Sequence, residues 1–123
     1  MPTDKQKYDI FICGGALHYQ CLRNLLPSVA RFGNLHLASI SLNTDELAHL
    51  SIYCDSIHHP RHDPDGYRNF NLFCTRDINR LARAPYFIKL DADVLLSEDW
   101  IDYVDGTIDR EPDAVLFGPT PGR

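Results

Sequence analysis

Short, nearly continuous apolar runs limit the folds that this sequence can adopt. Residues 8–13 form one such run, which stops at Gly14 and Gly15, and a second run follows Pro85 and stops at Asp91. The first is typical of a strand that is buried on both faces, and the glycines after it predict a tight turn where the backbone can approach a ligand closely. Parallel strands of this kind need crossover helices between them.

Helical and extended patterns alternate along the whole chain. The predicted strands cover residues 8–13, 35–42, 51–57, the run that ends at Asp91 to Asp93, and 114–117. The predicted helices cover 18–32 (kinked or divided at Pro27), a short segment that starts at Asn43 with Glu46 three positions later, 67–83, and a segment that Ser97 caps and Pro112 ends. This alternation predicts one α/β domain over residues 1–123, with a Rossmann-like, mostly parallel sheet and helices on both faces.

The composition is that of an ordinary globular domain. The 123 residues are 44% hydrophobic and 24% charged, and the formal net charge is -5. An acidic chain argues against general binding to nucleic acids or to anionic membranes. The apolar runs are too short for a transmembrane segment, and the first residues do not have the pattern of a signal peptide, so we expect a cytoplasmic protein or the cytosolic side of a larger one.

The four cysteines are Cys13, Cys21, Cys54 and Cys74. Their spacing is irregular and contains no Cys-x-x-Cys pair, and each has apolar neighbours. We therefore expect reduced core residues rather than disulfides or a zinc site.

Two carboxylates follow the apolar run after Pro85. Side chains alternate along a strand, so Asp91 and Asp93 should project to the same side. Two carboxylates suit Mg²⁺ or Mn²⁺, which take oxygen ligands and often share phosphates and water. The alternative is that both are simply the polar end of a strand. Lys89 should lie on that side too, either paired with Asp91 or solvated.

Three polar or glycine-containing segments fall at the predicted carboxyl ends of strands. They are Gly14-Gly15, residues 43–45 and residues 91–93. In open parallel sheets ligands bind beyond this edge, so the three segments should contribute to one site.

A further block lies before the Asp91 strand. Residues 66–69 read Gly-Tyr-Arg-Asn and open the predicted helix, and residues 84–94 read Ala-Pro-Tyr-Phe-Ile-Lys-Leu-Asp-Ala-Asp-Val. A helix that starts with Arg-Asn, followed by a strand that ends in Asp-x-Asp, resembles the nucleotide-sugar-binding half of GT-A glycosyltransferases, particularly the inverting family 2 type. The resemblance extends over residues 8–118.

The resemblance implies a role for each matching residue. Asp93 would hold the divalent metal that bridges the two phosphates of a nucleoside-diphosphate sugar, and Asp91 would contact the ribose or support the metal through water. Gly14, Gly15 and Ala16 would lie along the nucleotide. Two further positions are implied as donor contacts: Asp45 near the nucleobase, and Arg68 near the base or the phosphates.

The sequence departs from the family pattern in two loops and at its end. Gly14 to His18 lacks the usual threonine, tyrosine or asparagine, and Leu42 to Asp45 lacks the usual Asp-Asp or Asp-Gly pair. The family's acceptor site and catalytic base lie beyond the fifth strand, so we expect a second domain or chain to complete them. The implied activity is hexosyl transfer to an unknown sugar, lipid or protein.

Other functions fit parts of the same pattern. One is a non-catalytic nucleotide-binding remnant or subunit. Another is a haloacid-dehalogenase-like phosphatase with Asp91 as nucleophile, although that motif normally opens its domain. Arg68 at a helix start could bind phosphate or lie on a loop surface. The histidines His58, His59 and His62 could form a metal cluster, but a solvated loop explains them more simply.

Overall fold

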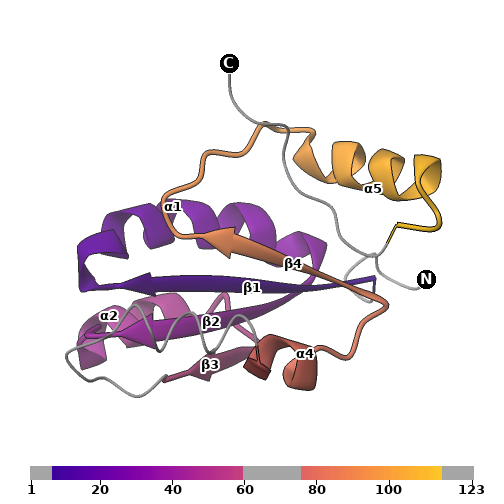
Figure 1. The fold of residues 1–123 in the computed structure, drawn as a ribbon. Helices are drawn as coiled ribbons and strands as arrows, with labels where there is room; N and C mark the ends of the chain where they lie inside the picture. Colours follow the sequence, from indigo (N-terminus) through magenta and orange to yellow (C-terminus); the bar gives the residue numbers. More distant parts are fainter. Residues whose placement is uncertain (1–6, 60–75, 115–123) are drawn as a thin grey trace.

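Four parallel strands form the centre of the protein in the computed structural model, which describes residues 7–59 and 76–114 (Figure 1). The strands are β1 (Tyr8–Gly15), β2 (Asn34–Ile40), β3 (Ser56–His58) and β4 (Tyr86–Asp91), in the spatial order β3-β2-β1-β4. The strand that comes first in the sequence is therefore central, and the predicted parallel α/β sheet is confirmed.

The register aligns the carboxyl ends of the strands. Cys13 of β1 lies beside Ala38 of β2 on one side and beside Asp91 of β4 on the other, and Ala38 lies beside His58 of β3. The segments after β1, β2 and β4 consequently leave the sheet at the same edge.

One face of the sheet carries the main hydrophobic core. Alternate residues of β1, including Ile10 and Ile12, pack with buried side chains of α1 (Tyr19–Val29), α2 (Thr44–Ser51) and α5 (Trp100–Arg110). Figure 1 shows α1 and α5 on the same side of β1 and β4. Each fully buried aliphatic side chain contributes roughly 1.5–3 kcal/mol, so this face holds most of the apolar stabilisation.

The opposite face carries a smaller cluster. Phe11 points away from Ile10 and Ile12, and it packs with Ala38 and with Ile78 of α4 (Ile78–Leu81). Helices therefore cover both faces, as predicted.

Two predicted helix boundaries differ from the structure. The helix after β4 begins at Trp100 rather than at Ser97, whose carbonyl only accepts the Trp100 N–H at 3.2 Å, so Ser97 is not its cap. The helix over 18–32 is a 3-10 turn (η2, Ala16–His18), then α1, then a second 3-10 turn (η3, Ala30–Phe32), and α1 runs through Pro27 without a break. Pro27 is on the exposed side of α1. Water can therefore donate to the helix carbonyl that the missing N–H of proline leaves without a donor.

The predicted strand over 51–57 is largely wrong. α2 continues to Ser51, and the N–H groups of Tyr53 and Cys54 then bond to the carbonyls of Leu50 and Ser51, which leaves only Ser56–His58 in the sheet. The predicted helix over 67–83 lies outside the described residues except for the part that contains α4, and the strand over 114–117 lies outside them except for Ala114.

The described cysteines are free. Cys13 and Cys54 are half-buried, but Cys21 is exposed, so the prediction of a core position is wrong for Cys21. Cys74 lies outside the described residues. Within residues 7–59 and 76–114, no helix has both the length and the apolar character to cross a membrane.

Candidate functional site

Gly14 and Gly15 are the last two residues of β1, so the strand continues through the glycines at which the sequence predicted a turn. A Cβ on Gly14 would lie 2.9 Å from the Cβ of Ala92, and a Cβ on Gly15 would lie 2.9 Å from the carbonyl oxygen of Ile40. Both distances are shorter than normal contacts, so neighbouring segments of the protein occupy the space that a side chain would need. Packing within the chain is therefore enough to require glycine at both positions, and the close approach of a ligand to this backbone stays a prediction.

The residues after these glycines face solvent. Ala16 is exposed, Leu17 is 95% exposed, and the Gly15 N–H donates to Nδ1 of His18 at 3.4 Å. The turn therefore presents a short exposed segment at the carboxyl edge of the sheet, beside the end of β4.

Asp91 and Asp93 both lie at this edge. Asp91 is the last residue of β4 and Asp93 is in the turn that follows, and both are exposed while Ala92 between them is buried. The carboxylates are thus open to solvent and are not covered by a helix. The carboxylate of Asp91, whose side chain is 65% exposed, forms an ion pair with Lys89, so the paired alternative for Lys89 is the one found.

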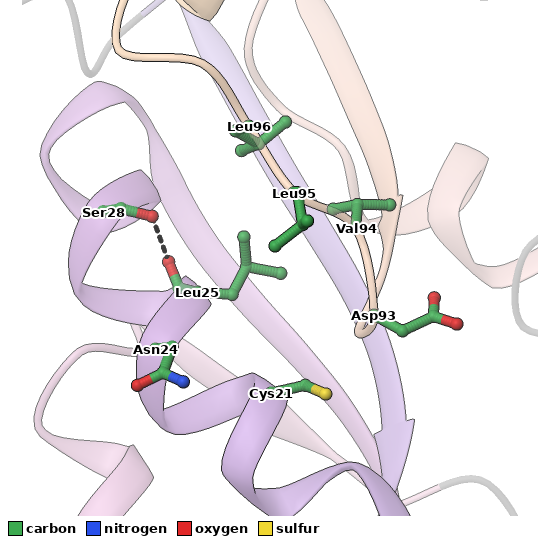
Figure 2. Close-up of a pocket in the computed structure, with 8 residues that line it drawn as sticks. All are labelled: Cys21, Asn24, Leu25, Ser28, Asp93, Val94, Leu95 and Leu96. Atoms are coloured by element: carbon green, nitrogen blue, oxygen red, sulfur yellow. Dashed lines mark hydrogen bonds between the residues drawn. The ribbon is translucent and has the colours of Figure 1, made fainter.

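A cavity of about 240 Å³ lies beside Asp93, between α1 and the segment after β4 (Figure 2). Leu25, Val94 and Leu96 give it apolar walls. Its remaining lining residues are Cys21, Asn24, Ser28, Asp93 and Leu95. Figure 2 shows the Asp93 carboxylate directed away from Leu25 and from α1. This cavity could not be predicted from sequence, because it depends on the packing of 93–96 against α1.

Asp45 lies at the same edge but farther along it. It is exposed in the first turn of α2, whose start is fixed by a reciprocal pair of hydrogen bonds: the Glu46 N–H donates to Asn43 Oδ1 at 2.8 Å, and the Asn43 N–H donates to Glu46 Oε1 at 3.0 Å. Because β1 separates β2 from β4, the ends of β2 and β4 are roughly 10 Å apart. Arg68 and Asn69 lie outside the described residues.

The described residues contain no group of three His, Cys, Asp or Glu side chains that could hold a metal ion. The two exposed carboxylates Asp91 and Asp93 fit a different kind of site. Mg²⁺ is commonly bound by one or two carboxylates, with substrate phosphates and water as the other ligands. Such a cation would share the Asp91 carboxylate with the Lys89 ammonium group.

A second polar group, which the sequence did not predict, lies on the face of Phe11. Asp9 Oδ1 accepts from His36 Nε2 at 2.8 Å, and its Oδ2 accepts the N–H groups of Arg83 at 2.6 Å and Ala84 at 2.7 Å. Burial by itself raises the pKa of Asp9, but these bonds together hold it below its usual value. The carboxylate is therefore ionised although its side chain is only 3% exposed.

The polar group continues to the outer strand β3. His36 Nδ1 lies 2.6 Å from Ser56 Oγ, which lies 2.7 Å from His58 Nε2. Burial, reinforced by His36, lowers the pKa of His58. His58 is the last residue of β3, so the interpretation as part of a solvated loop is wrong for His58.

The two polar regions are separate. One row across the sheet contains His58, Ala38, Cys13 and Asp91, in that order. His58 and Asp91 are therefore three strand spacings, or roughly 14 Å, apart.

The chain matches no protein-family model, no curated protein and no solved structure. The chemistry of the site therefore depends on the residues described above.

Proposed function

We propose that this chain is the donor-binding domain of a glycosyltransferase, and that it binds a nucleoside-diphosphate sugar at the carboxyl edge of its sheet. The observation that carries the proposal is the exposed pair Asp91 and Asp93 beside the end of the central strand β1. The strand order β3-β2-β1-β4 is the first part of the doubly wound order, in which ligands bind where the order reverses. In this sheet the order reverses between β1 and β4.

The metal role follows from the charge of the diphosphate. A divalent cation, Mn²⁺ or Mg²⁺, would offset the charge on a diphosphate leaving group. Asp93 would hold this cation, and Asp91, which pairs with Lys89, would support it. Gly14 and Gly15 at the end of β1 and the exposed Ala16 after them would lie along the nucleotide at the same edge.

A complete enzyme also needs an acceptor site and a catalytic base. The acceptor, a sugar, lipid or protein, and the base that activates it would be bound by a further domain or by a second chain. We place the activity in the cytoplasm, where thiols stay reduced, because Cys13, Cys21 and Cys54 are free.

Calorimetry with Mn²⁺ and a panel of nucleoside diphosphates tests the metal site. We expect metal-dependent binding by the unchanged protein and at least a tenfold loss, about 1.4 kcal/mol, in Asp93→Ala. Asp99→Asn is the matched control, because Asp99 is an exposed acid of the same segment whose side chain makes no capping bond.

The outcomes separate the possible functions. Unchanged Mn²⁺-dependent binding by Asp93→Ala would show that the metal role is wrong. Binding without transfer from a radiolabelled donor would leave a nucleotide-binding subunit, whereas release of phosphate from a simple phosphomonoester would support the phosphatase.

A further inference from the structure

The cavity between α1 and residues 93–96 is not used by the proposed nucleotide site. Figure 2 shows the Asp93 carboxylate directed away from Leu25 and α1, so the group proposed to hold the metal does not fill this space. The volume of the cavity is about 240 Å³. An apolar cavity of roughly 150 Å³ can hold a molecule of the size of benzene, so this one has room for roughly eight to ten non-hydrogen atoms.

The apolar walls of the cavity are held in place by the main core. Leu25 is buried in that core, and Val94 and Leu96 are half-buried and pack against it. These three side chains are therefore supported from behind, on the side away from the cavity. The cavity is thus formed before any ligand is bound, as is usual for small-molecule sites.

Leu95 lines the cavity from the side opposite α1. Its side chain is 99% exposed, and Figure 2 shows it directed toward Leu25. A single exposed leucine needs no explanation, and Leu17 is another at 95%. Leu95 differs from Leu17 because it faces an apolar wall across an open space. A molecule between Leu25 and Leu95 would remove apolar surface of both side chains from water.

Two neutral polar side chains of α1 complete this side of the cavity. The Ser28 hydroxyl donates to the carbonyl of Leu25 at 2.7 Å, so its oxygen remains as an acceptor. The Asn24 amide can donate and accept, and it makes no hydrogen bond within residues 7–59 and 76–114. A ligand with one hydroxyl or amide group could therefore bond to Asn24 while its apolar part contacts the leucines.

The charges around the cavity favour an uncharged ligand. Asp93 is acidic, and none of the described residues that line the cavity is a lysine, an arginine or a histidine. An anionic group would thus lie near a carboxylate without a compensating cation. A charged group of either sign would also lose water against the aliphatic walls.

We propose that this cavity binds an uncharged small molecule, with a branched or cyclic aliphatic part between Leu25 and Leu95 and one hydroxyl or amide group at Asn24. Neither a phosphate nor a metal ion takes part in this binding. The cavity is therefore a second ligand site, separate from the proposed nucleotide site at Asp91 and Asp93.

Methyl ¹H–¹³C spectra of the protein titrated with cyclohexylmethanol test the site. We expect saturable shifts of the methyl groups of Leu25, Val94 and Leu95. Leu17 is the internal control, because its side chain is also almost fully exposed but does not line the cavity, and its methyl groups should not shift. Cyclohexanecarboxylate has the same ring with a charged group, and it should bind at least about tenfold more weakly.

Ser28→Leu should fill the cavity and abolish these shifts. Ser28 is exposed and its hydroxyl bonds within its own helix, so the core is left unchanged. Gln20→Leu is the matched control, because Gln20 is also exposed on α1 but does not line the cavity, and this variant should bind like the unchanged protein.

Asn24→Ala tests the polar group. The variant should bind cyclohexylmethanol roughly two- to tenfold more weakly than the unchanged protein, because one hydrogen bond is lost. It should bind methylcyclohexane, which has no hydroxyl group, as tightly as before. Equal weakening for both molecules would show that Asn24 does not bind the hydroxyl group, and the proposal would fail in that part.

Three other results would overturn the proposal. Shifts at Leu17 as large as those at Leu95 would show non-specific association with exposed leucines. Undiminished binding by Ser28→Leu, folded by its amide spectrum, would place the ligand elsewhere. Equally tight binding of cyclohexanecarboxylate would show that the site does not select an uncharged ligand. The titrations contain no nucleotide and no metal, so their outcome is independent of the proposed transferase function.

Discussion

At the scale of single residues, Gly14 determines how closely the chain after β4 can approach the central strand. An added Cβ at Gly14 would lie 2.9 Å from the Cβ of Ala92 and 3.2 Å from a methyl carbon of Leu22. Both neighbours are buried, so they have little room to move. We predict that Gly14→Ala lowers the free energy of unfolding by about 1–3 kcal/mol, as measured by urea denaturation.

Gly106 provides the control for this prediction. It lies inside α5, and a Cβ there would meet only the guanidinium end of Arg110, at 3.3 Å. A flexible side chain can move, so Gly106→Ala should raise the free energy of unfolding by roughly 0.5–1 kcal/mol. If Gly14→Ala were as stable as the unchanged protein, the close packing at the start of the candidate site would be contradicted.

The residue scale also separates what the sequence could predict from what it could not. Alternation along one strand is local, so it correctly predicted that Lys89 lies on the same side of the strand as Asp91, where the two side chains form an ion pair. The bond between Asp9 and His36 joins residues 27 apart in the sequence. Whether they meet depends on the register of β1 with β2, which no local pattern specifies.

At the scale of secondary structure, α2 shows how side chains near a helix start can fix its position. The predicted pair Asn43 and Glu46 forms both reciprocal bonds. Asn43→Ala removes the acceptor for the Glu46 N–H, and we predict a loss of about 0.5–2 kcal/mol in the free energy of unfolding. Asn43→Ser keeps a capping oxygen and should lose much less. Equal losses in both variants would show that the cap contributes nothing.

Elements without such signals were predicted less well. Residues 51–57 contain enough apolar side chains to suggest a strand, yet Ile52 is 74% exposed in the turn after α2. The Ser51 hydroxyl bonds back to the carbonyl of Ala48, and this helical bond competes with an extended conformation. Ser97 was predicted to cap the next helix because serine is a common capping residue. The helix instead starts at Trp100, whose side chain packs in the core.

The candidate site was therefore predictable only in part. The alternation of strands and helices predicted a parallel sheet, which is confirmed, and with it the carboxyl edge as the place where a ligand is expected. The cavity beside Asp93 and the exposure of Cys21 arise from tertiary packing between α1 and the segment 93–96. No periodicity in the sequence encodes that contact.

At the scale of the whole molecule, acid and alkali should unfold the protein through different groups. The pKa of His58 is lowered by burial, and that of Asp9 is lowered by its hydrogen bonds despite burial. For both groups the unfolded chain binds the proton more readily than the folded protein does. Their contribution to the free energy of unfolding is therefore complete above the pKa of the unfolded chain and is lost as pH falls. The loss should begin below pH 6.5 for His58 and below pH 3.8 for Asp9.

The alkaline side depends on Lys7, Tyr8 and Asp105. The carboxylate of Asp105 accepts from the Tyr8 hydroxyl and from Lys7, which raises the pKa of Lys7, while burial and this bond raise the pKa of Tyr8. Because both pKa values are raised, the contribution of Lys7 and Tyr8 to the free energy of unfolding is complete at lower pH and is lost as pH rises beyond 10. We predict maximum thermal stability between pH 6.5 and 10.

Denaturant titrations at a series of pH values would check this profile. Each proton taken up on unfolding changes the free energy by about 1.4 kcal/mol per pH unit. His58→Gln should remove the decline that starts near pH 6.5 and leave the decline below pH 3.8 in place. A decline near pH 6.5 that persists in His58→Gln would assign it to another group.

The central place of β1 has a consequence for synthesis on the ribosome. β1 leaves the exit tunnel well before its partner β4, which begins only at Tyr86, and the Asp105 carboxylate that binds the Tyr8 hydroxyl follows later still. One side of β1 must therefore wait until β4 has been translated. During that interval Ile10 and Ile12 are available to wrong partners, so slow translation should favour chaperone engagement of the nascent chain over spontaneous closure of the sheet.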